Sequence, residues 1–188
     1  LLRTIQKKQF MIWESYYWKE DLKRFRKKIL QRTKQKRWIE ASNANAEKEI
    51  MISAFIIRKL FESKKLSNKF ELPSIKVAKY RTNGKKIHLL RRLSPEKYFI
   101  FDEPIEDTLS PIALCNQIMH SYIFTLIMNE KRNLTHFWVV SDWDKFKYLH
   151  QVEIKQFLVL LKKVSEYWPQ KEHYLFSEKK QDFVSIMH

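Results

Sequence analysis

Apolar residues recur every three or four positions along much of the chain, and this spacing predicts helices with one buried face. Residues 1–37 contain no proline or glycine and predict one long helix, and residues 38–66 predict a second. The segment 50–61 is apolar on nearly all sides, so we expect it to lie at the centre of the core. Residues 153–168 predict a further helix, which ends before Pro169 because proline cannot continue it.

The strongly apolar segment 110–128 predicts the helix around which the rest of the chain is organised. Ser110 suits the N-cap and Pro111 suits the first helical position. Asn116 and His120 nevertheless lie within this apolar segment, four residues apart. Buried polar side chains need hydrogen-bond partners. The two residues are therefore either satisfied polar groups of the core or part of a functional site.

Alternation of apolar and polar residues predicts strands in the remaining segments. Residues 74–81 alternate and are followed by Asn83-Gly84, a pair that favours a tight turn, so residues 85–90 are expected to return as the second strand of a hairpin. Residues 93–109 contain two prolines and five acidic side chains and predict a loop with one short helical turn. Two more hairpins are predicted, from residues 136–141 with 147–152 and from residues 174–176 with 183–187.

These elements predict a single domain over residues 1–188, long enough for one hydrophobic core. Its expected class is α+β, mainly α: a helical bundle of three to four helices decorated with antiparallel β-hairpins. The basic helix of residues 1–37 is expected to project from that core.

The net charge of +16, from 37 Lys and Arg against 21 Asp and Glu, indicates a polyanionic partner. We expect this partner to be a nucleic acid, and RNA rather than DNA. The alternative partner is an acidic protein on which the basic helix docks. A solvated helix face, an amphipathic helix on anionic lipid, and a lysine-rich genome composition are further interpretations of the same charges. The predicted nucleic-acid-binding residues are Arg24, Lys27, Lys28, Lys34, Arg37, Lys85, Lys86, Arg91 and Arg92.

Composition excludes several functional classes. Gly84 is the only glycine, so glycine-rich phosphate loops and dinucleotide fingerprints are excluded. Cys115 is the only cysteine, so an intramolecular disulfide and a cysteine-rich zinc site are excluded too. No apolar run has the length of a membrane-spanning helix, and no cleavable signal pattern is visible, which favours the cytoplasm. We predict no metal and no cofactor.

The segment 115–122, CNQIMHSY, resembles the motif of the HEPN superfamily of small helical bundles. That motif has an arginine, often a following polar residue, and a histidine four to six positions on. Cys115 stands here in place of the arginine, Asn116 is the polar residue, and His120 is in register. The resemblance implies a dimeric, metal-independent ribonuclease of a bacterial defence or toxin–antitoxin system, and the missing arginine implies a degenerate member. Arg132 with His136 fits the motif less well, because only three residues separate them.

The chemistry expected of such a site is RNA cleavage by the 2′-hydroxyl group. His120 would act as general base, and Asn116 would orient its ring or bind a phosphate oxygen. The cation would come from elsewhere, from Arg58 or Arg91. Arg58 is also expected to pair with Glu62, four residues on. In the competing hypothesis the protein is a non-enzymatic interaction or structural subunit, in which Asn116 and His120 only stabilise the fold.

Overall fold

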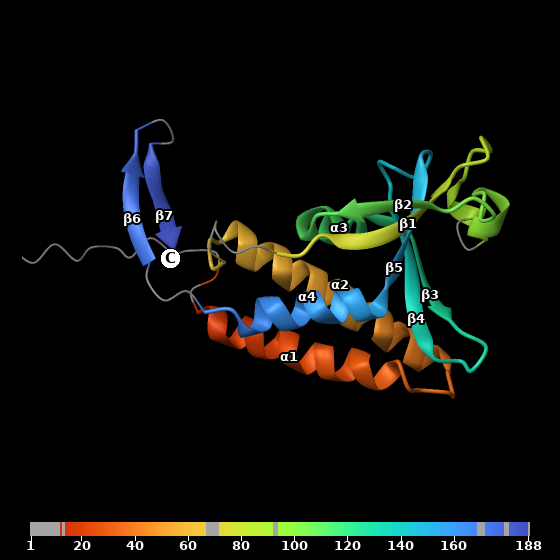
Figure 1. The fold of residues 1–188 in the computed structure, drawn as a ribbon, viewed down its shortest axis with the longest axis horizontal. Helices are drawn as coiled ribbons and strands as arrows, with labels where there is room; N and C mark the ends of the chain where they lie inside the picture. The colour runs from red at the N-terminus through yellow and green to blue at the C-terminus, as the bar shows by residue number, and fades with distance from the viewer. Residues whose placement is uncertain are drawn as a thin grey trace, which may run out of the picture.

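A five-stranded antiparallel sheet forms one side of the molecule (Figure 1). The structure is a computed structural model, and it describes residues 12, 14–66, 72–91, 94–168, 172–178 and 181–187. The spatial order of the strands is β2-β1-β5-β4-β3. They are β1 (Ile75–Arg81), β2 (Ile105–Leu109), β3 (Ser121–Met128), β4 (Leu134–Ser141) and β5 (Tyr148–Glu153).

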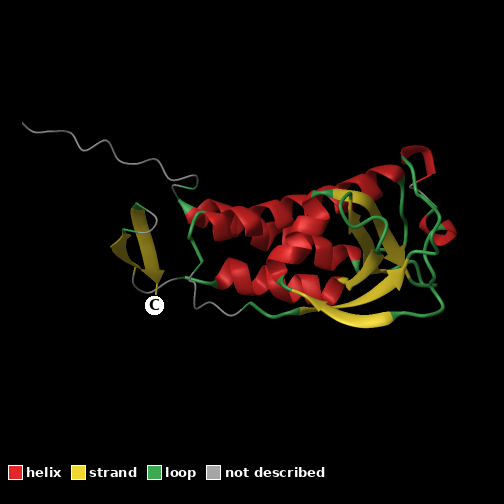
Figure 2. Cartoon of the chain, turned by 90° about the horizontal axis from the view of Figure 1, so that it is seen from above, coloured by secondary structure: helices red, strands yellow, loops and turns green. Residues whose placement is uncertain are grey.

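Four α-helices of the described chain pack on one face of this sheet, which we call the inner face. They run side by side in Figure 2. α3 and α4 contact the strands, and α1 and α2 pack behind them. The helices are α1 (Ser15–Arg32), α2 (Glu40–Glu62), α3 (Pro111–Met119) and α4 (Ile154–Glu166).

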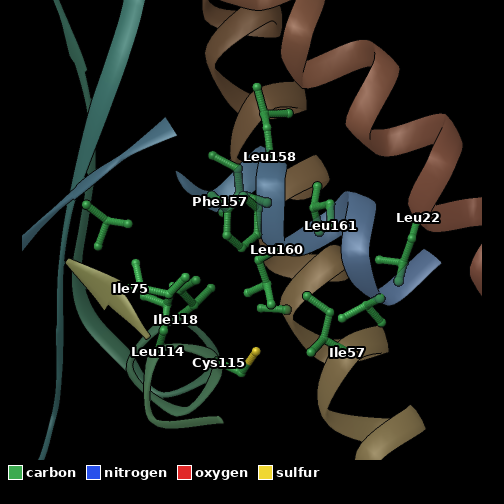
Figure 3. Packing of buried hydrophobic residues seen from close by; sticks show 14 of the residues in the cluster. Leu22, Ile57, Ile75, Leu114, Cys115, Ile118, Phe157, Leu158, Leu160 and Leu161 are labelled. Carbon is green, nitrogen blue, oxygen red and sulfur yellow. The ribbon is translucent and has the colours of Figure 1, made fainter. Parts of the chain in front are cut away.

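The main core lies between the helices and the inner face of the sheet (Figure 3). Phe157 of α4 is fully buried, and its ring meets the ring of Phe137 on β4 edge to face at 5.8 Å. Leu114 and Ile118 of α3 and Ile75 of β1 close the same cluster. Burial of each such side chain contributes about 1.5–3 kcal/mol. The apolar faces of the helices therefore pack against the sheet, as the spacing of apolar residues in the sequence predicts.

Part of the opposite, outer face of the sheet is covered by the connection between β1 and β2. Phe101 of this connection lies with its ring centroid 4.6 Å from those of Tyr80 on β1 and Trp138 on β4. Ile87 and Phe99 are buried in the same cluster. This covering explains why the strands are apolar on both sides at that end.

The predicted helical bundle decorated with hairpins is wrong, because the fold is built on the five-stranded sheet. The helix predicted over residues 110–128 ends at Met119, and Ser121–Met128 forms strand β3. β3 is rich in β-branched and aromatic residues, which suit a half-buried strand. Such a continuous apolar run does not alternate, so its periodicity does not distinguish strand from helix.

The predicted hairpin of residues 74–81 with 85–90 is also wrong. β1 pairs with β2 and β5, and residues 85–90 form an irregular segment leading into a 3-10 turn. Asn83 does form a turn, since its side-chain Oδ1 accepts from the N–H of Lys85, and Gly84 has a φ of 84°. The N–H of Asn83 donates to the carbonyl of Tyr98, however, so the chain turns onto the segment before β2. Residues 93–109 were expected to form a loop, but their last part, Ile105–Leu109, forms strand β2.

Other predicted elements are confirmed. The helix after β5 is α4, and the strands expected around residues 136–141 and 147–152 are β4 and β5. The expected C-terminal hairpin is a separate two-stranded sheet of β6 (Glu172–Ser177) and β7 (Asp182–Met187).

α1 accounts for residues 15–32 of the predicted basic helix, and residues 1–11 and 13 lie outside the described residues. Leu22 and Ile29 are fully buried, so α1 packs closely against α2 and α4. Among the described helices, none combines the length and the apolar character needed to cross a bilayer.

Candidate functional site

Asn116 lies on α3 and is held by an arginine from α2. Nη1 of Arg58 donates to Oδ1 of Asn116, and Nε of Arg58 lies 2.6 Å from Oε1 of Glu62. The predicted Arg58–Glu62 pair is confirmed. The fold thus brings a cation beside the segment that contains Cys115 and Asn116. That cation is already paired with a carboxylate and an amide oxygen.

His120 is exposed at the C-cap of α3, so it is not a buried polar group of the core. Its backbone N–H donates to the carbonyl of Asn116 at 3.0 Å, and its own carbonyl accepts from the N–H of Asp142 at 3.0 Å. The imidazole therefore stands at the surface where α3 gives way to β3.

Cys115 is inert as a nucleophile. Its side chain is fully buried, and burial raises the pKa of its thiol to about 12. A thiol with this pKa stays protonated at neutral pH.

The predicted basic residues of α1 have different environments. Arg24 lies 2.9 Å from Asp21 in an exposed pair. Lys27 and Lys28 are exposed, and neither pairs with a carboxylate in the described part of the chain. The two lysines therefore leave a positive potential on the outer side of α1.

Exposed cations without ion-pair partners among the described residues lie on two segments that are distant in sequence and adjacent in the fold. Nε1 of Trp38 donates to the carbonyl of Arg132 at 2.9 Å, across 94 residues of sequence. This bond holds the α1–α2 connection against the β3–β4 turn, and Figure 1 shows the two side by side. We call the five exposed cations of the two segments the basic end: Lys34, Lys36, Arg37, Lys131 and Arg132.

Positive charge prevails at the basic end. Glu130 of the β3–β4 turn and Glu40 at the start of α2 are acidic, but none of the five cations forms an ion pair with a described residue. Arg132 has a φ of 62°, a left-handed conformation that closes the turn between Asn129 and Asn133.

The base of the α1–α2 connection is fixed by a polar network. Arg32 binds Glu49 through two hydrogen bonds, Nε to Oε2 at 2.7 Å and Nη2 to Oε1 at 2.9 Å. Gln35 accepts from Arg32 and donates to the carbonyl of Arg37 at 2.7 Å. A cavity of about 340 Å³ opens beside this network and includes Lys28 in its lining. These hydrogen bonds hold the backbone of the α1–α2 connection, and with it the cations that the connection carries, in a defined position.

The remaining predicted cations lie elsewhere. Lys85 and Lys86 are exposed in the β1–β2 connection, near the opposite end of β4 from the β3–β4 turn. Arg91 closes the 3-10 turn Leu89–Arg91, and Arg92 lies outside the described residues. The structure thus separates the predicted set into two groups, and it adds Lys36, Lys131 and Arg132 to the first. Sequence reasoning missed Lys131 and Arg132 because only the Trp38 contact brings them to the site.

A polar cleft of about 460 Å³ lies on the uncovered part of the outer face of the sheet, with Glu106, His136 and Glu153 in its lining. Burial lowers the pKa of His136 below its usual value. The carboxylates make this cleft a poor place for a phosphate backbone. No cluster of three or more metal-ligating side chains occurs in the described ranges.

Comparisons of the chain with protein-family models, with curated proteins and with solved structures each find no match.

Proposed function

We propose that the protein binds nucleic acid, and RNA in particular, through the basic end. The observation that carries the proposal is the Trp38–Arg132 hydrogen bond, which fixes cations from two distant segments on one surface. Lysine and arginine side chains attract the phosphate backbone and release its counterions on binding. Lys28 on α1 adds an exposed cation beside the basic end, in the lining of the cavity next to Arg32 and Gln35.

RNA is favoured over duplex DNA by the shape of the basic end. Its cations stand on a helix connection and a strand turn, and not on a helix that could enter a major groove. Unpaired RNA in loops and ends adapts to such irregular surfaces. The alternative ligand of this surface is an acidic protein.

The first experiment measures binding of a fluorescent single-stranded RNA by anisotropy between 50 and 200 mM salt, a range over which five single-strand phosphate contacts weaken binding by roughly a hundredfold. The test variant is Lys34→Ala/Arg37→Ala/Arg132→Ala. The matched control, Lys155→Ala/Lys162→Ala/Lys163→Ala, removes equal charge from exposed positions of α4.

We expect the test variant to bind at least about tenfold more weakly and to lower the slope of log K against log salt by about 2, since each single-strand contact contributes ~0.7. The control should bind like the wild type. Equal losses in both variants would show that total charge, and not the basic end, attracts RNA. Absence of binding at 50 mM salt would leave the acidic protein as the partner.

Cleavage is a second candidate function, and the Arg58–Asn116 contact beside an exposed His120 favours it. The resemblance to the HEPN superfamily, with its dimers and defence systems, remains a prediction. Incubation of wild type and His120→Ala with total RNA tests it. Loss of cleavage in the variant supports the assignment, whereas absent or unchanged cleavage removes it.

A further inference from the structure

Four large apolar side chains are exposed at the end of the sheet opposite the β3–β4 turn. Leu89 and Leu90 are 62% and 89% exposed in the β1–β2 connection. Trp143 and Phe146 are 86% and 50% exposed in the β4–β5 turn. We call these four residues the apolar tip.

The two segments of the apolar tip are joined at their base. The N–H of Thr82 donates to the carbonyl of Lys147 at 3.1 Å, and the N–H of Ile100 donates to the carbonyl of Arg81 at 2.9 Å. Both segments lie at the upper right in Figure 1. Ile87 is buried two residues before Leu89, so the β1–β2 connection is anchored to the sheet while its leucines face solvent.

Cations flank these apolar side chains along the sequence. Arg81, Lys85 and Lys86 are exposed and have no acidic partner among the described residues. Lys145 and Lys147 belong to the β4–β5 turn, where they pair with Asp142 at 2.5 Å and Asp144 at 2.9 Å. The sequence adds Arg91 and Arg92 directly after the leucines. The apolar tip therefore has an excess of positive charge on the side of the leucines.

We propose that the apolar tip inserts into the surface of an anionic lipid membrane. Leucine and tryptophan side chains leave water favourably at the boundary between headgroups and acyl chains, and tryptophan is enriched there. Neighbouring lysines and arginines are attracted to the negative leaflet. Nucleic acid fits the tip less well, because bases could stack on Trp143 and Phe146 but gain little from the two adjacent leucines.

The experiment measures co-sedimentation of the full chain with vesicles of phosphatidylcholine alone or with about one-third phosphatidylserine. The test variant is Leu89→Ser/Leu90→Ser/Trp143→Ser. The matched control, Leu30→Ser/Ile52→Ser/Val159→Ser, changes exposed apolar residues of the helices. Circular dichroism confirms that both variants are folded, and RNA anisotropy is measured on each.

We expect the wild type to bind the phosphatidylserine vesicles and the test variant to bind at least about tenfold more weakly. The control should bind vesicles like the wild type, and all three proteins should bind RNA equally. Three outcomes overturn the proposal: no vesicle binding by the wild type, equal vesicle binding by wild type and test variant, or loss of RNA binding in the test variant. The last would assign the tip to base stacking.

Discussion

At the scale of single residues, the buried ion pair of Arg32 and Glu49 differs from the exposed ion pairs on the surface. The side chains of Arg32 and Glu49 are 16% and 6% exposed and form a bidentate pair beneath the α1–α2 connection. Exposed pairs such as Lys162–Glu166, at 4.0 Å, contribute little because water screens them. The buried pair instead joins the end of α1 to α2 and so holds the α1–α2 connection, which carries part of the basic end, in place.

Glu49→Ala should lower the free energy of unfolding by about 3–5 kcal/mol, because it leaves the largely buried Arg32 guanidinium without its carboxylate. Urea denaturation measures the loss. Glu166→Ala, at an exposed pair, should change stability by less than about 1 kcal/mol. The double variant Arg32→Leu/Glu49→Leu should recover most of the loss, and a double variant as unstable as the single one would contradict this explanation.

His150 should make stability depend on pH. Burial and the nearby Lys79 lower its pKa to about 4, although Asp144 and Asp107 oppose the shift. Between pH 6.5 and 4 the unfolded chain therefore takes up a proton that the folded chain does not. The resulting stability is present above pH 6.5 and is lost as the pH falls toward 4, by about 3 kcal/mol in total.

Urea denaturation at several pH values, compared between wild type and His150→Leu, isolates this contribution from that of the carboxylates. The wild-type curve should fall more steeply between pH 6.5 and 4 than the curve of the variant. His120→Gln, at an exposed histidine, serves as the control and should follow the wild type. Parallel curves for all three proteins would show that His150 titrates normally.

At the scale of elements, α3 connects the two edge strands of the sheet. It follows β2 at one edge, crosses the inner face and leads into β3 at the other edge. Ser110 caps its start, since Oγ accepts from the N–H of Ala113 at 3.2 Å, and Pro111 occupies its first position. The predicted start of this helix is confirmed, although its predicted end is wrong.

Ser110→Ala should destabilise the protein by about 1 kcal/mol, because the N–H of Ala113 loses its acceptor at the helix start. The midpoint of urea unfolding reports the change. Ser110→Asp keeps an acceptor and also places a negative charge at the positive end of the helix, so it should unfold like the wild type. If both substitutions destabilise equally, the cap is not the cause.

At the scale of the whole molecule, β4 separates the two proposed binding surfaces. Its eight residues span ~27 Å between the β3–β4 turn and the β4–β5 turn. The basic end lies at the first turn and the apolar tip at the second. RNA and membrane would therefore bind opposite ends of the sheet without competing for the same side chains.

Labelled RNA should consequently sediment with phosphatidylserine vesicles only when the wild-type protein is present. Neither triple alanine replacement at the basic end nor triple serine replacement at the apolar tip should support this recruitment. If RNA instead displaces the protein from vesicles, the two ligands share one surface.

The sequence predicts those parts of the fold that depend on local pattern. α2, α4, β4 and β5 follow from periodicity and flanking turn residues, and Lys34 and Arg37 follow from charge. β2 and β3 were missed because their assignment depends on distant strand partners, β1 for β2 and β4 for β3. The basic end was half missed for the same reason, since its second half is joined to the first by a single tryptophan hydrogen bond.

The strand order also constrains how the chain folds. β1 lies between β2 and β5, and β5 is the last strand of the sheet to be synthesised. The centre of the sheet therefore closes only by pairing between distant segments, which makes folding slower than that of a helical bundle of equal length. Until Tyr148–Glu153 arrives, β1 and β4 each keep an unpaired edge. A nascent chain stalled before that point would expose two strand edges that favour aggregation.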